Sequence, residues 1–321
     1  MKYKIYITDY DYNEISEVYD EFSAIDCEII ELKTKNEDKL IKVVSDADAI
    51  LVQYAPITSR VIDILYKCKV ISRFGIGIDM IDISAATLKK IPVCNVPDYC
   101  IDEVTDHTLA LILTLARKII PLDFSVRNGE WNTIDVAKPI FNLKEQTLGF
   151  VGFGKIPQNL YPKIKPIFGN IIVFDPYLKD ETIKKYNLKS VTFYNLITNS
   201  DFISIHCPLN EDTRHLFDIK EFYLMKKTVY IINTSRGPII NTVALYRAVK
   251  DKIIAGAALD VLEQEPPEKD LGLLELNNII ITPHSSYYSE SSIKLLKRIT
   301  ARNVVKILSN EEPINILNKV F

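Results

Sequence analysis

Side chains suited to proton transfer and anion binding follow apolar runs that are typical of β-strands. His284 comes directly after Pro283, which follows the run 278–282. Arg236 follows the run 228–233, and a pair of acids, Glu263 and Glu265, follows the run 254–260. The carboxyl ends of parallel strands meet at one edge of a sheet, where ligands bind in open α/β folds. At that edge, an imidazole would serve as acid or base, and a guanidinium would bind a carboxylate with two parallel hydrogen bonds.

The search for a group that titrates near neutral pH is narrow, because the chain has only four histidines. A single histidine is more often structural than catalytic. His284 is favoured because other functional groups are expected at the same edge. His206 is the main alternative, since it ends the strand-like run 201–206. We expect His107 and His215 to be structural.

The segment 147–175 predicts a βαβ unit. An apolar run is followed by Gly152 and Gly154, and a second apolar run ends at Asp175. Glycines allow a pyrophosphate to approach the backbone, and the N-terminus of the next helix favours its negative charge. Asp175 would accept hydrogen bonds from a ribose 2′-hydroxyl and repel a 2′-phosphate, which favours NAD over NADP. A single G-x-G is equally typical of an ordinary strand–turn–helix.

Proline replaces the third glycine of the usual G-x-G-x-x-G pattern, at Pro157. Proline is tolerated in a first helical turn, whose N–H groups have no partner within the helix. Pro162 and Pro166 follow inside the expected helix, and each removes a helical hydrogen bond. We therefore expect a kinked or broken helix and weakened cofactor binding.

Strand-like and helix-like runs alternate along the chain, which predicts an α/β fold of two doubly wound parallel sheets with a cleft between them. Residues 1–100 and 290–321 are assigned to a flavodoxin-like substrate-binding domain. Residues 101–289 are assigned to a Rossmann-type dinucleotide-binding domain. Asp102 is the expected N-cap of a long helix whose broad apolar surface suits contact between two subunits. The stretch that follows, 121–146, is expected to be a loop in which Trp131 is a packing anchor.

The composition is that of an ordinary soluble enzyme. The chain has 321 residues, 47% hydrophobic residues and a net charge of −3, and its basic residues are scattered. We therefore expect no nucleic-acid partner and no membrane partner. Five cysteines without a C-x-x-C pair, and no N-terminal signal, favour reduced thiols in the cytoplasm, and no metal site is expected.

Seven stretches together resemble one family: RFGIGIDMID, NVPDYCIDEVTDHTLALIL, TLGFVGFGKI, HCPLNEDTRHLF, NTSRGPIIN, GAALDVLEQEPP and ITPHSSYYSE. They are similar, in the same order, to the NAD-dependent D-isomer-specific 2-hydroxyacid dehydrogenases. The subgroup that contains D-3-phosphoglycerate dehydrogenases and the C-terminal binding protein corepressors is the most similar. The resemblance implies hydride transfer between NAD(H) and a small D-2-hydroxy acid or its 2-oxo partner, in a homodimer. Which acid is used cannot be read from the sequence.

The resemblance also implies the role of each site residue. His284 would be the acid/base, Glu265 would orient it, and Arg236 would bind the carboxylate and polarise the carbonyl. Substrate contacts would come from Gly75, Ile76, Gly77, Arg236 and His284. Cofactor contacts would come from Thr105, Gly152, Gly154, Lys155, Ile156, Asp175, His206, Cys207, Pro208, Thr213, Thr234, Arg236, Asp260 and His284.

Three residues depart from the family pattern: Pro157, Met80 in place of a usual asparagine, and Thr105 where a smaller residue is common. The alternative function is an NAD(H)-sensing binding protein, similar to the corepressors, with vestigial catalysis. A nucleotide-binding fold with other chemistry would require the agreement among the strand ends to be accidental.

Overall fold

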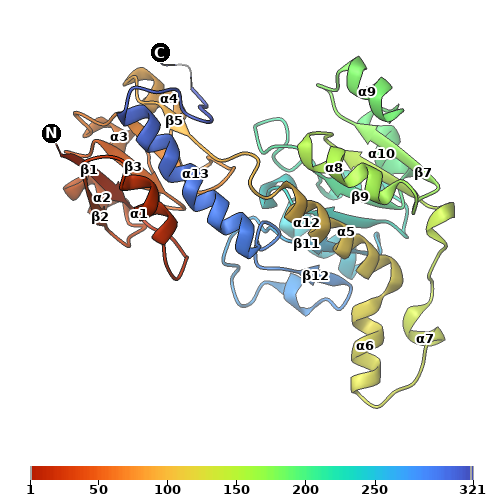
Figure 1. The fold of residues 1–321 in the computed structure, drawn as a ribbon. Coiled ribbons are helices and arrows are strands. Elements are labelled where there is room, and N and C mark those ends of the chain that lie inside the picture. The colour runs from red at the N-terminus through yellow and green to blue at the C-terminus, as the bar shows by residue number, and fades with distance from the viewer. Residues whose placement is uncertain (1, 319, 321) are drawn as a thin grey trace. The chain divides into compact units, whose positions relative to one another are not determined.

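The computed structural model describes residues 2–318 and residue 320, which form two compact units (Figure 1). One unit contains the chain up to Cys100 together with the chain from Ser289 onward, and the other is Ile101–Tyr288. The sequence analysis placed the second boundary, where the chain returns to the first unit, one residue later. Which molecule each unit binds remains a prediction.

The first unit is built on a parallel sheet of five strands in the order β2-β1-β3-β4-β5, the flavodoxin-like order that was predicted. Ile50 and Leu51 in the central strand β3 are fully buried, as expected for a sheet covered on both faces. The strands are β1 (Tyr3–Ile7), β2 (Cys27–Glu31), β3 (Ala49–Val52), β4 (Val70–Arg73) and β5 (Val93–Cys94). The helices are α1 (Ser16–Phe22), α2 (Glu37–Val43), α3 (Ser59–Asp63), α4 (Ile83–Leu88) and α13 (Glu290–Leu308).

The C-terminal segment completes the first unit. Helix α13 begins with a capping box at Ser289, whose side chain accepts a hydrogen bond from the N–H of Ser292. After the helix the chain returns to the sheet, where Leu317 N donates to Val93 O at 2.9 Å and Val93 N donates to Asn318 Oδ1 at 2.7 Å. The predicted return of the tail to this part of the chain is confirmed.

The second unit contains a parallel sheet of seven strands in the order β12-β11-β10-β9-β6-β7-β8. Two halves wind outward from β6, so the predicted doubly wound fold is confirmed. The strands are β6 (Thr147–Val151), β7 (Asn170–Phe174), β8 (Lys189–Ser190), β9 (Phe202–Ile205), β10 (Tyr230–Asn233), β11 (Gly256–Leu259) and β12 (Ile279–Ile281). The helices are α5 (Ile101–Arg117), α6 (Ile119–Arg127), α7 (Ile134–Ala137), α8 (Lys155–Ile164), α9 (Asp180–Tyr186), α10 (Phe193–Asn199), α11 (Ile219–Leu224) and α12 (Thr242–Lys250).

The structure corrects three predictions around α5. The helix begins at Ile101, so Asp102 lies in its first turn and is not the N-cap. The expected loop after it contains α6 and α7, which extend away from the sheet in Figure 1. Trp131 is 91% exposed, so it is not a packing anchor within the chain.

Helix α8 is unbroken despite its prolines, contrary to the prediction. Pro157 lies in the first turn, where the prediction that it is tolerated is confirmed. Pro162 lies inside the helix, and Pro166 lies beyond its last residue, Ile164. The helix therefore loses only the hydrogen bond that Pro162 cannot donate, and it ends before the second proline would interrupt it.

Candidate active site

The three predicted catalytic residues follow three neighbouring strands. In the sheet of the second unit, β10, β11 and β12 lie side by side and run parallel. Arg236, Glu265 and His284 leave the carboxyl ends of these strands in that order. The expectation that they emerge from one edge of one sheet therefore agrees with the strand order.

The structure joins His284 to Glu265. The Nδ1 atom of His284 lies 2.6 Å from Glu265 Oε2, and the other carboxylate oxygen accepts a hydrogen bond from Leu262 N at 2.9 Å. Because an ionised carboxylate only accepts hydrogen bonds, Nδ1 must carry the proton, which leaves Nε2 for a substrate. His284 also has a φ of 51°, a conformation that is costly for a side chain other than glycine and often marks a functional site.

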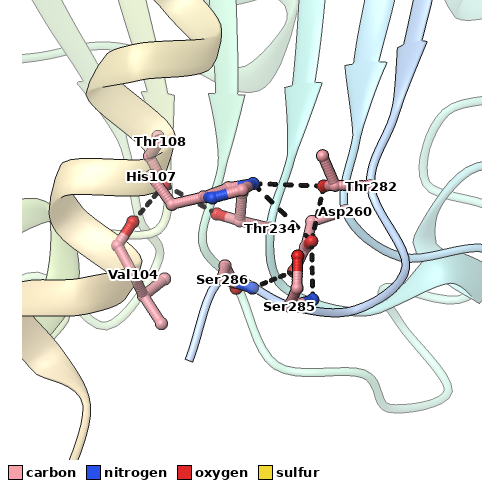
Figure 2. A network of polar contacts seen from close by, with 8 residues as sticks. All are labelled: Val104, His107, Thr108, Thr234, Asp260, Thr282, Ser285 and Ser286. Atoms are coloured by element: carbon pink, nitrogen blue, oxygen red, sulfur yellow. Dashed lines mark hydrogen bonds and ion pairs between the residues drawn. The ribbon is translucent and has the colours of Figure 1, made fainter. Parts of the chain in front are cut away.

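Asp260 binds residues on both sides of His284; Figure 2 shows its contacts with Thr282, Ser285 and Ser286. Its backbone oxygen accepts a hydrogen bond from His284 N at 2.8 Å. One carboxylate oxygen accepts bonds from Thr282 Oγ1 at 2.6 Å and Ser285 N at 2.9 Å, and the other from Ser286 N at 3.0 Å. Asp260 is only 1% exposed, so these bonds are shielded from water. They fix the backbone on both sides of His284.

His107 reaches this network from helix α5, as Figure 2 shows. Its Nε2 atom lies 3.1 Å from Thr282 Oγ1 and 3.7 Å from Asp260 Oδ1. Thr282 gives its own proton to Asp260, so His107 Nε2 must be the donor to Thr282. The neighbouring Thr108 pairs with Thr234 through their hydroxyls at 2.9 Å. His107 was expected to be structural, and this network is compatible with that role.

The loop after β10 presents Arg236. Asn233 is fully buried and organises this loop: its amide donates to Arg236 O at 2.9 Å, and its oxygen accepts from Ser235 N at 3.0 Å. At Gly237 a Cβ atom would lie 1.9 Å from the carbonyl group of Leu262. The loop with Arg236 therefore touches the loop with Glu265 backbone to backbone, and only glycine fits at the contact.

The glycine turn after β6 is open to a ligand at Gly154. Gly152 has a φ of 87°, and a Cβ atom there would lie 2.9 Å from the backbone of His206 and Cys207. A Cβ atom at Gly154 would meet nothing within 4 Å. Gly154 is the N-cap residue of α8, so the first N–H groups of that helix, starting at Lys155, surround the open side. This is the arrangement that binds a pyrophosphate.

Asp175 ties the end of β7 to the glycine turn. Its Oδ2 atom accepts a hydrogen bond from Phe153 N at 2.8 Å, and its Oδ1 atom accepts one from Tyr177 N at 2.9 Å. Each oxygen has a second lone pair with which it can accept a hydrogen bond from a ribose hydroxyl. These residues therefore fit the adenosine half of a dinucleotide.

His206 is unsuited to acid/base chemistry near neutral pH. Burial lowers the pKa of its imidazole to about 3, so the ring is neutral. Its Nε2 atom is paired with Ser204 Oγ at 2.8 Å. This favours His284 over the main alternative acid/base, and leaves His206 beside the glycine turn where the sequence placed it.

Three thiols, of which Cys94 is buried and Cys68 and Cys207 are half-buried, should resist alkylation in the folded protein. Burial raises the pKa of Cys207 to about 11 and that of Cys68 and Cys94 to about 12. Since the thiolate is the reactive form, iodoacetamide at pH 8 should leave these three cysteines unmodified, and urea should expose them. Peptide mass spectrometry would measure the labelling. Rapid labelling of Cys94 in the native protein would contradict the burial seen here.

The remaining predicted residues lie in both units. Thr105 is fully buried and donates to Ile156 O at 3.4 Å, and Thr213 Oγ1 donates to Pro208 O at 2.6 Å. The three predicted substrate contacts of the first unit follow β4, where Gly75 has a φ of 135° and Ile76 O accepts a bond from Asn95. Their contact with substrate remains a prediction.

Sequence reasoning missed the members of the polar network other than Asp260 and Thr234. His107 and Thr108 are adjacent polar residues in an apolar helix, a signal that could have directed attention to them. Ser285 and Ser286 act through their backbone N–H groups, which no residue type reveals.

Comparison with known proteins defines the class of this fold and site. The profile of the D-isomer specific 2-hydroxyacid dehydrogenase NAD binding domain matches residues 109–286. A glyoxylate reductase of Paecilomyes thermophila has the same fold, with a TM-score of 0.88, 25% identity, and coverage of 98% of each chain. The protein is thus an NAD-dependent oxidoreductase.

Two relatives are more similar in sequence than this reductase. The chain is 37% identical over 317 residues to a D-3-phosphoglycerate dehydrogenase of Methanocaldococcus jannaschii, covering 98% of this chain but 59% of that protein. It is 36% identical to a glyoxylate reductase of Thermococcus litoralis, covering 89% of this chain and 85% of that protein. The chain belongs to the D-isomer specific 2-hydroxyacid dehydrogenase family, so the resemblance seen in the sequence is confirmed.

The alternative of a binding protein gains no support from these comparisons, in which the relatives carry the names of enzymes. Among residues 2–318 and 320, no helix is both long enough and apolar enough to cross a membrane.

Proposed function

We propose that this protein reduces a small 2-oxo acid to the D-2-hydroxy acid with NADH, and that His284, Glu265 and Arg236 carry out the reaction. The observation that supports this most directly is the 2.6 Å contact between His284 Nδ1 and Glu265, which leaves Nε2 to act on substrate. The similarity to glyoxylate reductases over most of their length favours a small substrate.

Each residue has a distinct task in the proposed reaction. Bound NADH supplies the hydride that adds to the carbonyl carbon of the substrate. Protonated His284 gives its Nε2 proton to the carbonyl oxygen, and in the reverse direction neutral His284 takes it back. Glu265 holds the ring by a charge-assisted hydrogen bond, and Arg236 binds the substrate carboxylate through its planar fork.

The residues proposed to hold NAD are those of the glycine turn and its surroundings. The N–H groups at the start of α8 would bind the pyrophosphate, and Asp175 would bind the adenosine ribose. Thr234 and Asp260, at the ends of β10 and β11, would lie near the nicotinamide. His206, Cys207, Pro208 and Thr213, in the segment after β9, would lie along the dinucleotide.

A panel of 2-oxo acids tests the function. Purified protein is incubated with NADH and, in turn, glyoxylate, pyruvate, hydroxypyruvate, 3-phosphohydroxypyruvate and 2-oxoglutarate, and NADH absorbance is followed. Turnover of at least one acid to the D-hydroxy product is expected. NADH binding in calorimetry without turnover of any acid would instead support the binding protein.

Replacement of Asp175 should change the choice of cofactor. Asp175→Asn keeps an acceptor oxygen but loses the charge, so the variant should bind NADH more weakly and accept NADPH more readily. Since a hydrogen bond to a charged group contributes about 1.5–3 kcal/mol, KM for NADH should rise about ten- to hundredfold. Steady-state kinetics with both cofactors measures this. An unchanged NADH/NADPH ratio would remove Asp175 from the cofactor site.

We also infer a homodimer in the cytoplasm, although its contact surface differs from the one predicted. Most apolar residues of α5 are buried within the second unit, so that helix does not present the expected surface. Large apolar side chains are exposed instead on and between α6 and α7, and such clusters mark interaction sites. They are Ile119, Ile120, Phe124, Val126, Trp131 and Ile134.

Light scattering tests the assembly. The wild-type protein should have the mass of two chains, and Phe124→Glu should shift it toward one. A wild-type monomer at micromolar concentration would exclude the dimer. The cytoplasmic location is inferred from the five free cysteines, and fractionation of cells would test it.

A further inference from the structure

His215 and Glu263 form a second histidine–carboxylate pair in the second unit. The Nε2 atom of His215 lies 2.6 Å from Glu263 Oε1, and the two side chains are 39% and 28% exposed. His215 has a φ of 52°, the same left-handed conformation as His284. The proposed reaction uses the other pair, so this one has no assigned role.

The second pair joins the two loops that carry the proposed catalytic groups. The backbone N–H of His215 donates to Pro238 O at 2.8 Å, two residues after Arg236. The ring of the same histidine contacts Glu263, two residues before Glu265. One residue, on the segment that follows β9, thus contacts both loops, which belong to the neighbouring strands β10 and β11.

Glu263 is anchored at a second point. Its Oε2 atom accepts a hydrogen bond from Thr242 N at 2.6 Å, at the start of α12. Burial acts to raise the pKa of Glu263, but hydrogen bonds from Thr242 and His215 outweigh burial and lower the pKa, so the side chain is a carboxylate at neutral pH. A neutral His215 with its proton on Nε2 still donates to that carboxylate, so the contact does not require a charged ring.

The backbone contact at Gly237 does not by itself hold the two loops together. At Gly237 the backbones of the two loops touch, which prevents closer approach. A single van der Waals contact cannot prevent the loops from sliding or parting. The hydrogen bonds of His215 to Pro238 and Glu263 span the same two loops and oppose such movement.

We propose that His215 and Glu263 are positioning residues that hold Arg236 in register with the Glu265–His284 pair. The proposal rests on the proposed function. Misplacement of reacting groups by about 1 Å can cost about 10²-fold in rate. Loss of the His215–Glu263 contact should therefore lower kcat more than it raises the KM for NADH, because Asp175 and the glycine turn after β6, which are proposed to bind the adenosine half of the cofactor, lie outside both loops.

The test compares His215→Ala with His215→Gln, whose amide can replace the Nε2–H donor. The alanine variant should lose about tenfold or more in kcat for the best 2-oxo acid of the panel, and the glutamine variant should recover most of it. Arg214→Ala, at the exposed neighbouring position, is the control and should behave as wild type. Glu263→Ala should match His215→Ala, and the double variant should lose no more than either single variant.

Hydrogen exchange supplies a readout that does not need activity. In His215→Ala, amides of residues 234–240 and 261–266 should exchange faster, while those of β6 stay unchanged. A wild-type protein inactive on every 2-oxo acid would refute the proposed function, and the exchange result would still decide the positioning role. Unchanged kcat and exchange in His215→Ala, or a kcat loss that His215→Gln does not recover, would overturn the proposal. If His215→Ala does not fold, the same measurements on Glu263→Ala decide it.

Discussion

His284→Ala should lower kcat for the reduction of a 2-oxo acid by about 10²–10⁴-fold, the range expected for loss of a positioned acid/base. The variant should still bind NADH, because His284 contributes no hydrogen bond to the glycine turn. Its imidazole is held by Glu265 at 2.6 Å, and its backbone by Asp260. Rapid-mixing measurements of NADH oxidation, together with calorimetry of NADH binding, would separate the two effects.

Glu265→Gln is the matched variant for this experiment. Glutamine keeps the size of the side chain and can still accept a hydrogen bond from His284 Nδ1, but it carries no charge. A smaller loss in kcat than that of His284→Ala is expected, and the double variant should be no worse than His284→Ala alone, because the two residues act as one unit. An active His284→Ala enzyme, with kcat within a few fold of wild type, would remove this residue from the chemistry.

The placement of His284 and Glu265 at one edge of the sheet could be predicted because it follows from the topology of parallel strands. Parallel strands all place their carboxyl ends at one edge, so polar residues that follow several strands converge without any knowledge of the loops. The sequence could not show how the loops at that edge contact one another. The contact of Gly237 with Leu262 and the bonds from Asp260 to Ser285 and Ser286 depend on backbone paths, which residue types do not specify.

The helices and strands could likewise be predicted where a residue pattern is sufficient, but not where the surroundings of a segment decide its structure. The apolar runs 228–233, 254–260 and 278–282 correctly indicated the strands β10, β11 and β12. The segment after α5 was wrongly expected to be a loop. Its helices α6 and α7 expose apolar side chains, so they lack the pattern of a helix that buries one apolar face within its own chain. Trp131 was misassigned for this reason: burial within the chain was assumed, although it is exposed there.

Lys297→Met should destabilise the first unit by about 3–5 kcal/mol, the usual cost of removing one partner of a buried ion pair and leaving the other charge unpaired. The Nζ atom of Lys297 lies 2.6 Å from Glu17 Oε2, and their side chains are 6% and 10% exposed. The pair joins α13 to α1, so its loss weakens the packing of the C-terminal helix against α1. Arg302→Met is the control: Arg302 joins the same two helices through Glu21 but is 48% exposed, and should cost no more than about 1 kcal/mol.

The pH dependence of the Lys297 effect gives the sharper test. Burial acts to raise the pKa of Glu17, but the hydrogen bond and the charge of Lys297, together with hydrogen bonds from the backbone and from Ser16, outweigh burial and lower the pKa below the ordinary value of 4.5. The pair therefore stabilises the folded state fully above that value and progressively less as the pH falls through the folded pKa. In Lys297→Met the hydrogen bond and the charge of Lys297 would be lost while burial remained, so Glu17 would be easier to protonate, and acid should relieve part of the cost.

The difference in unfolding free energy between wild type and Lys297→Met should therefore be largest at neutral pH and shrink below about pH 4.5, the unfolded-state value. Urea unfolding followed by circular dichroism measures it. Adding Glu17→Leu to Lys297→Met should restore much of the stability, because no unpaired charge is then buried. A difference that stays constant from neutral to acidic pH, or a double variant no more stable than the single one, would show that lost packing and not the unpaired carboxylate causes the destabilisation.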